Sequence, residues 1–347
     1  MSWCFKVKKE RGKDEKALIR NGGMLLEKLI ALNNGRSNPI RCFSIKELND
    51  ATNNYDQDQV ISNDEHYTMY KGFLQDRPVI VKKYKGESFL ENSINDIVFS
   101  SQMSVHNNVL KLLGCCLESN TPILVLEYAK REILKYYVYR HYRTEFKPLT
   151  WKNRLKIAVD VANVIAYLHT AFRKPIVHRD LRISNIMLEE ENMAKVNDFS
   201  FSMSIPEGET HIIDTVKGTL GYMAPEYYSS GGTFNEKIDV YSFGALLLVL
   251  LTGRKAHERV PIPCPSSTTD EYYYGLVDYV KKNVEKEKVD EILDPIIVEE
   301  ELSRPRLKAF ALLALQCTSI CAEDRPEITD VGKQLGQMYR SLISDYS

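Results

Sequence analysis

The sequence predicts an α+β protein with a strand-rich first part and a larger helical second part. Short runs of apolar and β-branched residues at 110–116 and 124–128 are typical of strands. Further along, residues 151–169 carry apolar side chains at helical spacing, and closing helices are expected over 303–343. This order, with strands first and helices after them, is the basis of the predicted class.

Length and composition are those of an ordinary globular protein. The 347 residues suffice for a large core and predict one large domain or two lobes. Lysine plus arginine number 46 against 47 for aspartate plus glutamate, which argues against nucleic-acid binding. Seven cysteines, an odd number that includes the adjacent Cys115 and Cys116, do not indicate a disulfide framework, so a reducing compartment is expected. No Cys/His cluster has zinc-site spacing, so no structural metal is expected.

The N-terminus lacks the apolar core of a signal peptide, and its second residue is Ser2 instead of the glycine that myristoylation requires. The longest strongly apolar run, 243–251, is about half of the roughly 18 residues that a membrane span needs. We therefore expect a cytoplasmic protein, with a location at the plasma membrane through its partners as the alternative.

An N-terminal extension is expected over residues 1–42. Residues 1–20 carry many charges and few apolar side chains, which predicts a solvated arm. Behind Gly22 and Gly23 the spacing predicts a short amphipathic helix. Its apolar residues are Met24, Leu25, Leu26, Leu29, Ile30 and Leu32. We expect this face to pack on the chain's own first lobe, and docking to another protein is the alternative.

The stretch with the clearest chemistry is 176–188, which contains His178-Arg179-Asp180 and Asn185 and is followed by Asp198-Phe199-Ser200. In phosphoryl transfer, one carboxylate receives the proton of the attacking hydroxyl, while an amide oxygen and a second carboxylate hold Mg²⁺. Asp180 fits the first role, and Asn185 and Asp198 fit the metal roles. The alternative is a buried His-Arg-Asp turn with a chance Asp-Phe nearby, but order, spacing and apolar flanks all favour the phosphoryl-transfer site.

These motifs resemble those of eukaryotic protein kinases, and the resemblance covers roughly residues 43–343. It implies a bilobal fold, with a small β-rich lobe over 43–128 and a larger helical lobe over 129–347. It also implies ATP and Mg²⁺ as cofactors. In the second lobe, Asp239 opens a central apolar helix, and Arg325 of Asp-Arg-Pro is expected to pair with Glu226 of Ala-Pro-Glu. Such residues hold the scaffold and do no chemistry.

The first lobe carries the nucleotide-binding motifs. Ser44 with Glu47 predicts a capping box at the lobe's first helix. Val79-Ile80-Val81-Lys82 matches the strand whose lysine pairs with the α- and β-phosphates and with a glutamate of the next helix. Asp96 stands at that glutamate position with a side chain one methylene shorter, which counts against contact with Lys82. Residues from Glu127 to Ala129 are expected to form the hinge beside the nucleotide.

Several residues depart from the kinase pattern in ways that oppose nucleotide binding. The three glycines of the phosphate-covering hairpin are replaced by Ser62, Asp64 and Tyr67, which blocks close backbone approach. A carboxylate such as that of Asp64, about 5 Å from a phosphate charge at an effective dielectric near 20, costs roughly 3 kcal/mol. Three further departures are Ile80 in place of alanine against the adenine, Arg182 in place of the usual catalytic-loop lysine, and Ser200 in place of the metal-turn glycine.

Two segments of the second part admit two interpretations each, and a third predicts a surface insertion. Residues 130–148 are rich in Tyr and Arg, which favours either a binding surface or an exposed helix that covers the second lobe. This set comprises Tyr136, Tyr137, Tyr139, Arg140, His141, Tyr142 and Arg143. Ser202, Ser204, Thr210 and Thr215 lie in the activation-segment equivalent, where Arg179 is placed to bind a phosphate or the hydroxyls are merely solvated. The Pro- and Ser-rich residues 257–275 predict a surface insertion.

Among kinases, the stretch from Asn21 to Ile30 together with 39–44 resembles the plant wall-associated-kinase-like cytoplasmic group. The missing loop glycines, with Leu112 to Cys116 and Phe199 to Ser202, resemble its immune adaptor pseudokinases. The resemblance implies two partners: the leucine-rich-repeat domain of a coiled-coil nucleotide-binding (NLR) immune receptor, and receptor-like cytoplasmic kinases that pathogen effectors have modified.

Two functions therefore compete. The first is an adaptor that does not transfer phosphate, and the second is an active or weakly active serine/threonine kinase that uses Asp180 and Arg182 in catalysis and Lys82, Asp96, Glu127, Asn185 and Asp198 to bind the nucleotide and metal. The six departures that oppose nucleotide binding favour the adaptor, because transition-state stabilisation depends on positioning. They are Ser62, Asp64, Tyr67, Ile80, Asp96 and Ser200. A third hypothesis, nucleotide binding without transfer, stands between the two.

Overall fold

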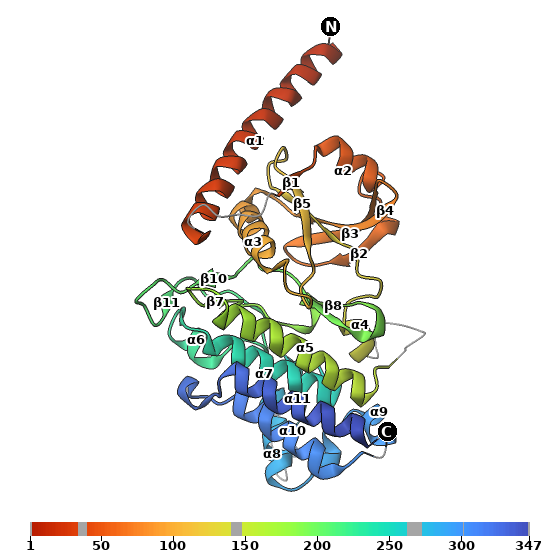
Figure 1. The fold of residues 1–347 in the computed structure, drawn as a ribbon, viewed down its shortest axis with the longest axis vertical. Helices are drawn as coiled ribbons and strands as arrows, with labels where there is room; N and C mark the ends of the chain where they lie inside the picture. The colour runs from red at the N-terminus through yellow and green to blue at the C-terminus, as the bar shows by residue number, and fades with distance from the viewer. Residues whose placement is uncertain (1, 34–39, 140–147, 262–272, 301, 346–347) are drawn as a thin grey trace, which may run out of the picture. The chain divides into compact units, whose positions relative to one another are not determined.

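The computed structural model describes residues 2–33, 40–139, 148–261, 273–300 and 302–345. The chain forms two compact units (Figure 1), one of residues 1–130 with 197–202 and one of 131–196 with 203–347. Residues 197–202, which contain the predicted metal turn, thus pack with the first unit although they follow the catalytic loop in sequence. Within the described ranges, no helix is long and apolar enough to cross a lipid bilayer.

A six-stranded sheet forms the centre of the first unit, in the order β1-β5-β6-β4-β3-β2. Its strands are β1 (Arg41–Cys42), β2 (Val60–Asn63), β3 (Tyr67–Leu74), β4 (Arg77–Tyr84), β5 (Leu112–Cys116) and β6 (Ile123–Glu127). The β1–β5 pair is parallel and the other neighbours are antiparallel. The strands expected at 110–116 and 124–128 are confirmed as β5 and β6. Central positions such as Val81 and Val125 are fully buried, since both faces of the sheet are covered.

Three helices accompany this sheet: α1 (Ser2–Asn33), α2 (Ile45–Ala51) and α3 (Leu90–Met103). The predicted capping box is confirmed at α2, where the Ser44 hydroxyl accepts from the Glu47 N–H and the Glu47 carboxylate accepts from the Ser44 N–H. Helix α3 buries Ile94, Ile97 and Val98 completely.

Helix α1 differs from the expected arm followed by a short helix. It is continuous from Ser2, so the helix begins well before the predicted start behind Gly23. Most of the side chains described over 14–20 are exposed, as expected of a solvated segment. The reason is visible at one stripe of the helix, where Ala17, Asn21, Leu25 and Leu29 are buried at intervals of four residues. The Asn21 amide donates to the carbonyls of Leu117 and Ser119 at 2.9 and 2.8 Å. The predicted packing on the first lobe is confirmed for Leu25 and Leu29, whereas Leu26 and Ile30 of the same predicted face are exposed. Figure 1 shows the C-terminal half of α1 beside α3.

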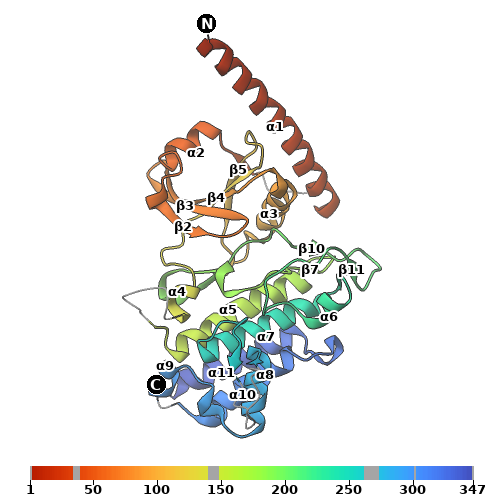
Figure 2. The same cartoon turned by 180° about the vertical axis from the view of Figure 1, so that it is seen from behind.

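The second unit is mainly helical. Its helices are α4 (Lys135–Val138), α5 (Trp151–Thr170), α6 (Pro225–Ser229), α7 (Lys237–Thr252), α8 (Leu276–Glu285), α9 (Pro295–Glu299), α10 (Arg304–Cys317) and α11 (Ile328–Ser344). Figure 2 shows α5, α7, α10 and α11 stacked against one another. This confirms the predicted helix after Trp151 and the closing helices. Short antiparallel pairs complete the unit: β7 (Ile176–Val177) with β10 (Met203–Ser204), β8 (Ile186–Leu188) with β9 (Ala194–Val196), β11 (Ile212–Ile213) with β12 (Thr233–Phe234), and β13 (Val260–Pro261) with β14 (Tyr273–Tyr274).

Helix α7 lies at the core of the second unit and is apolar around its whole circumference, as expected for a fully buried helix. Gly244 allows α10 to approach, because a Cβ at this position would meet Cys317 Cβ at 2.7 Å and the Ala314 carbonyl at 2.9 Å. The predicted scaffold pair is confirmed, since the Arg325 guanidinium donates to both carboxylate oxygens of Glu226 at 2.6 Å.

The Tyr- and Arg-rich stretch is only partly described. Tyr137 and Tyr139 are buried, which favours the interpretation that these aromatic residues cover the second lobe. Arg140, His141, Tyr142 and Arg143 lie outside the described residues. Most of the predicted surface insertion, 262–272, also lies outside them, and its two ends pair as β13 and β14.

Candidate functional site

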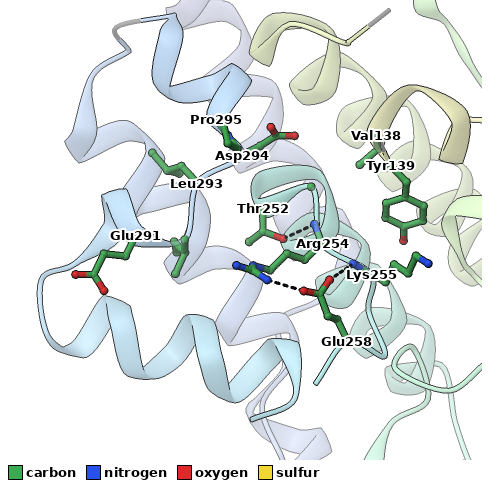
Figure 3. Close-up of a pocket in the computed structure, with 12 residues that line it drawn as sticks. Val138, Tyr139, Thr252, Arg254, Lys255, Glu258, Glu291, Leu293, Asp294 and Pro295 are labelled. Atoms are coloured by element: carbon green, nitrogen blue, oxygen red, sulfur yellow. Dashed lines mark hydrogen bonds and ion pairs between the residues drawn. The ribbon is translucent and has the colours of Figure 1, made fainter. Parts of the chain in front are cut away.

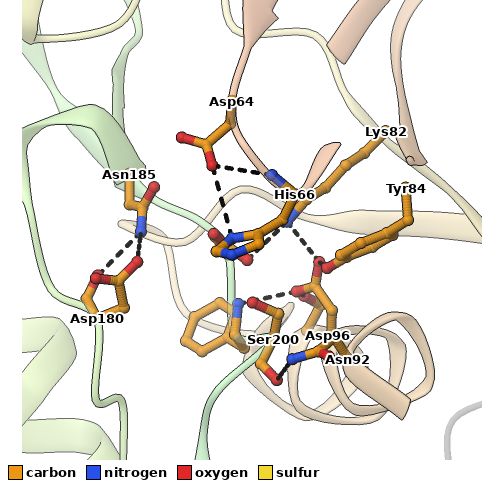
Figure 4. A network of polar contacts seen from close by, with 12 residues as sticks. Asp64, His66, Lys82, Tyr84, Asn92, Asp96, Asp180, Asn185 and Ser200 are labelled. Carbon is orange, nitrogen blue, oxygen red and sulfur yellow. Dashed lines mark hydrogen bonds and ion pairs between the residues drawn. The ribbon is translucent and has the colours of Figure 1, made fainter. Parts of the chain in front are cut away.

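Strand β4 places Lys82 in the interior of the first unit. Its side chain is fully buried, and its amine donates to Asp96 Oδ2 at 2.7 Å and to Asp198 Oδ1 at 2.8 Å. Figure 4 shows the Lys82 side chain reaching from its strand toward Asp96 and Tyr84. Burial disfavours the charged amine, but the carboxylates of Asp198 and Asp96 outweigh it and raise the pKa of Lys82. The amine is therefore a cation shared between two anions.

The argument against contact between Asp96 and Lys82 is wrong. Besides the amine of Lys82, Asp96 accepts from Tyr84 Oη at 3.0 Å, Ser100 Oγ at 3.1 Å and the Phe199 N–H at 2.9 Å. Ser100 lies one turn further along α3, and its hydroxyl helps to hold the Asp96 carboxylate in place beside Lys82. Burial and the carboxylates of Asp96 and Asp198 raise the pKa of Tyr84 far above its usual range, so it stays a donor.

The hairpin between β2 and β3 covers Lys82 with an aromatic side chain. The Tyr67 ring is 3% exposed, and its centre lies 3.9 Å from Lys82 Nζ. The Tyr84 ring lies 5.3 Å from the same amine and meets the Tyr67 ring edge-on, with their centres 5.8 Å apart. This geometry is a buried cation–π interaction, which excludes other ligands from that side of the amine.

The tip of this hairpin is closed by its own contacts. The Asp64 N–H donates to the Tyr67 carbonyl at 2.9 Å, and Asp64 Oδ1 accepts from the His66 N–H at 3.4 Å (Figure 4). The His66 ring meets Phe89 and Phe201 edge-on at 5.1 and 5.4 Å between ring centres. The hairpin thus packs onto Phe89, just before α3, and onto Phe201, just after the predicted metal turn, and the Asp64 N–H is not available to an anion.

The first unit does not fit a nucleotide triphosphate in this arrangement. The Lys82 amine faces an aromatic ring and two carboxylates, and Asp64 adds a third carboxylate at the hairpin. The carboxylates of Asp96 and Asp198 balance the charge of the Lys82 amine, and the Tyr67 ring closes one side of the amine to phosphate oxygens. Ile80, at the predicted adenine side, is fully buried and pairs with Leu126 of β6. Glu127, the predicted hinge residue, accepts from the Lys111 N–H at 3.2 Å.

The turn at Asp198-Phe199-Ser200 is held by helix α3. The Asn95 amide nitrogen lies within 3.3, 3.0 and 2.8 Å of the carbonyl oxygens of Phe199, Ser200 and Ser202, and its two hydrogens are shared among them. Asn92, one turn earlier, donates to the Ser200 carbonyl at 3.4 Å (Figure 4). The carbonyl of Ser200, the residue that replaces the expected glycine, is therefore fixed. The Lys28 amine of α1 donates to Asn95 Oδ1 at 3.3 Å, which extends this network to the N-terminal helix.

The predicted catalytic loop of the second unit is assembled around Asp180. The Asn185 amide donates to the Asp180 carbonyl at 2.9 Å and to Asp180 Oδ2 at 3.3 Å (Figure 4). Thr219 Oγ1 donates to Asp180 Oδ1 at 2.6 Å, and Arg182 Nε lies 3.1 Å from Oδ2. Asn185 is fully buried and Asp180 is 6% exposed. The residues expected to serve proton transfer are thus brought together, although arginine replaces the usual lysine.

Arg179, the predicted phosphate ligand, is occupied by the chain itself. Its guanidinium pairs with Asp214 at 2.9 Å, donates to the Thr215 carbonyl at 2.9 Å and to Tyr227 Oη at 2.7 Å, and lies 4.4 Å from the centre of the Phe234 ring. Burial opposes the charge of Asp214, but the hydrogen bond from Arg179 outweighs it and lowers the Asp214 pKa. A carboxylate therefore takes the place that a phosphate was expected to occupy.

The second unit also contains a cavity of about 610 Å³ between α4 and the segments at 252–258 and 291–295. Arg254 in the lining contacts Glu258 at 2.5 Å (Figure 3). Asp294 contacts the buried Arg154 at 2.7 Å. Among the predicted Tyr/Arg-rich residues that are described, Tyr139 lines it. Lys255 and Glu291 also line the cavity, so its charged groups are of both signs.

Sequence reasoning missed four residues that shape the first-unit site. Tyr84 lies two residues after Lys82 on β4, so the period of a strand places both on one face and could have indicated it. The contacts of His66 and Phe201 join segments distant in sequence, as do those of Asn95, and no local pattern signals them.

The comparison with protein families decides the class. A family model described as protein tyrosine and serine/threonine kinase matches residues 57–335. The chain belongs to this kinase family. The two units accordingly correspond to the β-rich and helical lobes of the bilobal kinase fold, as predicted.

Relatives of this kinase-family chain come from Arabidopsis thaliana. It is 42% identical over 328 residues to a protein named non-functional pseudokinase ZED1, which covers 91% of this chain and 94% of the relative. It is 38% identical over 345 residues to serine/threonine-protein kinase ZRK1, and the match covers 97% of this chain and 96% of that protein. It is 37% identical to wall-associated receptor kinase-like 1, covering 98% of this chain and 46% of that protein. The predicted likeness to wall-associated kinases and pseudokinases is confirmed.

Proposed function

We propose that this chain is a kinase-fold adaptor of plant innate immunity that transfers no phosphate and works through protein partners. The observation that carries the proposal is the buried Tyr67 ring 3.9 Å from the Lys82 amine, with Asp96 and Asp198 on the same amine. A phosphate-binding lysine that an aromatic ring covers has no open side for a phosphate, and phosphoryl transfer depends on orienting the nucleotide.

Relatives support the same proposal. One protein similar over almost the whole chain is named a non-functional pseudokinase, so loss of catalysis is compatible with this sequence length and organisation. The scaffold of the second unit is intact, as shown by the Arg325–Glu226 pair. Selection for a folded but inactive protein preserves such scaffold pairs and leaves nucleotide contacts free to change.

The proposed partners are those that the sequence resemblance implies. They are the leucine-rich-repeat domain of a coiled-coil NLR receptor and receptor-like cytoplasmic kinases modified by pathogen effectors. In this role the chain links the two proteins, and its cytoplasmic location follows from theirs.

Nucleotide binding is tested by calorimetric titration of the purified full chain with ATP and Mg²⁺, with an Asp198→Asn variant as control. We expect no heat of binding up to millimolar ATP. Micromolar binding by the wild type that is lost in Asp198→Asn overturns the claim that the site is closed.

Partner binding is tested by co-elution in size-exclusion chromatography with the leucine-rich-repeat domain of a coiled-coil NLR from the same plant. The kinase domain of a wall-associated receptor kinase serves as the matched control, because it shares the fold and has its own extracellular role implied by its receptor name. We expect this chain to form a complex with the leucine-rich-repeat domain and the control kinase domain to form none. Equal behaviour of both proteins contradicts the adaptor proposal.

The second candidate is a serine/threonine kinase, and the catalytic loop favours it. Asp180 contacts Asn185, Thr219 and Arg182 in an arrangement that could accept a hydroxyl proton. A radiometric assay on a generic protein substrate tests this candidate. Robust transfer that Asp180→Asn abolishes establishes the kinase and removes the adaptor-only view.

A further inference from the structure

A pair of cysteine residues lies at the β1 edge of the first-unit sheet, away from the nucleotide-site residues. The parallel pairing of β1 and β5 places Cys42 opposite Cys115. Cys42 is exposed and Cys115 is completely buried, and both are free thiols. Opposite residues of paired strands point to the same face, so the two side chains are neighbours.

The register of this pair is fixed on both sides of Cys42. On one side, the Arg41 carbonyl lies so close to Gly114 that a Cβ there would meet it at 2.3 Å, so only glycine accommodates β1. On the other side, the Phe43 N–H donates to the Cys115 carbonyl at 2.9 Å, and the Phe43 ring is buried in the core. A slip of β1 would lose both contacts, and so the two cysteines are held together.

The register brings the two thiols close enough to affect each other. Burial, with smaller contributions from the neighbouring Cys42 and Cys116 thiols, raises the pKa of Cys115 to about 12. Neighbouring strands lie about 4.8 Å apart, inside the span of about 4.4–6.8 Å between Cα atoms that a disulfide bridges. Cys116 is the next residue along β5 and therefore points to the opposite face, which makes it the poorer partner for Cys42.

We propose that Cys42 and Cys115 form a reversible intramolecular disulfide when the protein meets a peroxide. The exposed Cys42 thiolate attacks a peroxide oxygen, the O–O bond breaks, and hydroxide leaves, which gives a sulfenic acid on Cys42. Cys115 then loses its proton and attacks the Cys42 sulfur, the S–O bond breaks, and water leaves. Two thiols are oxidised by two electrons, and the peroxide is reduced by two. A small thiol such as glutathione reverses the reaction by exchange at the exposed sulfur.

This modification site goes beyond the proposed adaptor function. The bond would fasten β1 covalently to β5, and with it the connection between α1 and the sheet. Because β1 has only two residues, its attachment otherwise rests on few ladder hydrogen bonds and on the Phe43 side chain. We expect the bridge to make this edge of the first unit resistant to local opening.

The test uses the full chain with Cys4→Ser and Cys264→Ser, which removes two thiols that could exchange. The protein is treated with hydrogen peroxide under native conditions, alkylated after denaturation, and mapped by mass spectrometry without reduction. We expect a cross-linked peptide joining Cys42 and Cys115, a loss of two free thiols, and recovery of both on adding dithiothreitol. Formation should accelerate by about tenfold per pH unit if the Cys115 proton must leave.

Two variants provide the controls. Cys42→Ser removes an exposed thiol, leaves folding intact, and should abolish the cross-link. Cys321 is the other exposed thiol among the described residues, and Cys321→Ser should leave the cross-link unchanged. A rise in the melting temperature on oxidation, absent in Cys42→Ser, is the second readout. Recovery of Cys42 as sulfinic acid or joined to Cys116, with Cys115 still alkylated, overturns the proposal.

Discussion

The Lys82 amine lies 3.9 Å from the centre of the buried Tyr67 ring. Tyr67 stands at a position where the kinase family pattern has glycine. The ring occupies one side of the amine, forms a cation–π interaction with it, and packs edge-on against Tyr84 of β4. One substitution at the hairpin therefore closes the site and stabilises the closed form. The following experiments separate these effects from the scaffold.

Replacing Tyr67 should open the site. Tyr67→Ala removes the ring from the Lys82 amine, so we expect affinity for MgATP at least about tenfold higher than that of the wild type, measured by titration calorimetry. The stability of the protein should fall by about 3 kcal/mol, because a large buried side chain is lost.

The matched control is Tyr70→Ala, which removes a buried tyrosine from the opposite face of β3. It should cost similar stability and leave the nucleotide affinity unchanged. Equal affinities of all three proteins would show that Tyr67 does not obstruct the site.

The contacts of Asn95 hold the metal turn. Asn95→Ala strips the carbonyls of Phe199, Ser200 and Ser202 of their shared donor, and we expect a loss of about 1–3 kcal/mol in chemical denaturation. Hydrogen exchange of residues 197–202 should rise. Asn92→Ala on the same helix removes a single contact of 3.4 Å and should have the smaller effect. The reverse order would contradict this assignment.

The Arg179–Asp214 pair is expected to order the activation segment without phosphorylation. Asp214→Ala should increase hydrogen exchange over 203–217 and lower stability by about 1 kcal/mol, since Asp214 is partly exposed. Glu207 lies on the same segment and forms an exposed ion pair with Arg173. Glu207→Ala breaks this pair and should change neither the hydrogen exchange nor the stability. Similar exchange in both variants would mean that the segment is ordered by other contacts.

Acid should weaken the second unit through Asp239. Burial opposes the charge of this carboxylate, but His169 and the His178 N–H outweigh it and lower the Asp239 pKa below its usual 3.8. Because the folded pKa is below the unfolded value, the stabilisation is complete above the unfolded value and is lost as pH falls through the folded value.

Asp239→Asn cannot carry this charge. We expect it to be less stable than the wild type by about 3 kcal/mol near neutral pH, and the difference should shrink below pH of about 4. Urea unfolding at several pH values measures this. A difference that stays constant down to pH of about 3 would exclude titration of Asp239 as its cause.

The sequence alone was enough to predict the class, the order of strands and helices, and the identity of the chemical groups. Such features depend on local periodicity and on motifs whose spacing is short, as in His178 to Asn185 or the capping box at Ser44. The glycine replacements at Ser62, Asp64 and Tyr67 also indicated an obstructed nucleotide site before any coordinates were considered.

Only the tertiary structure decided how that site is obstructed. The Asp96 contact with Lys82 depends on how closely α3 packs on the sheet, and the Asn95 contacts join residues about a hundred positions apart in sequence. The helix that begins at Ser2 is stabilised by docking of Asn21 and Leu25 on the first unit, which a charged local sequence does not reveal. Sequence patterns report the preferences of neighbours along the chain, whereas burial and long-range hydrogen bonds exist only once distant segments have packed together.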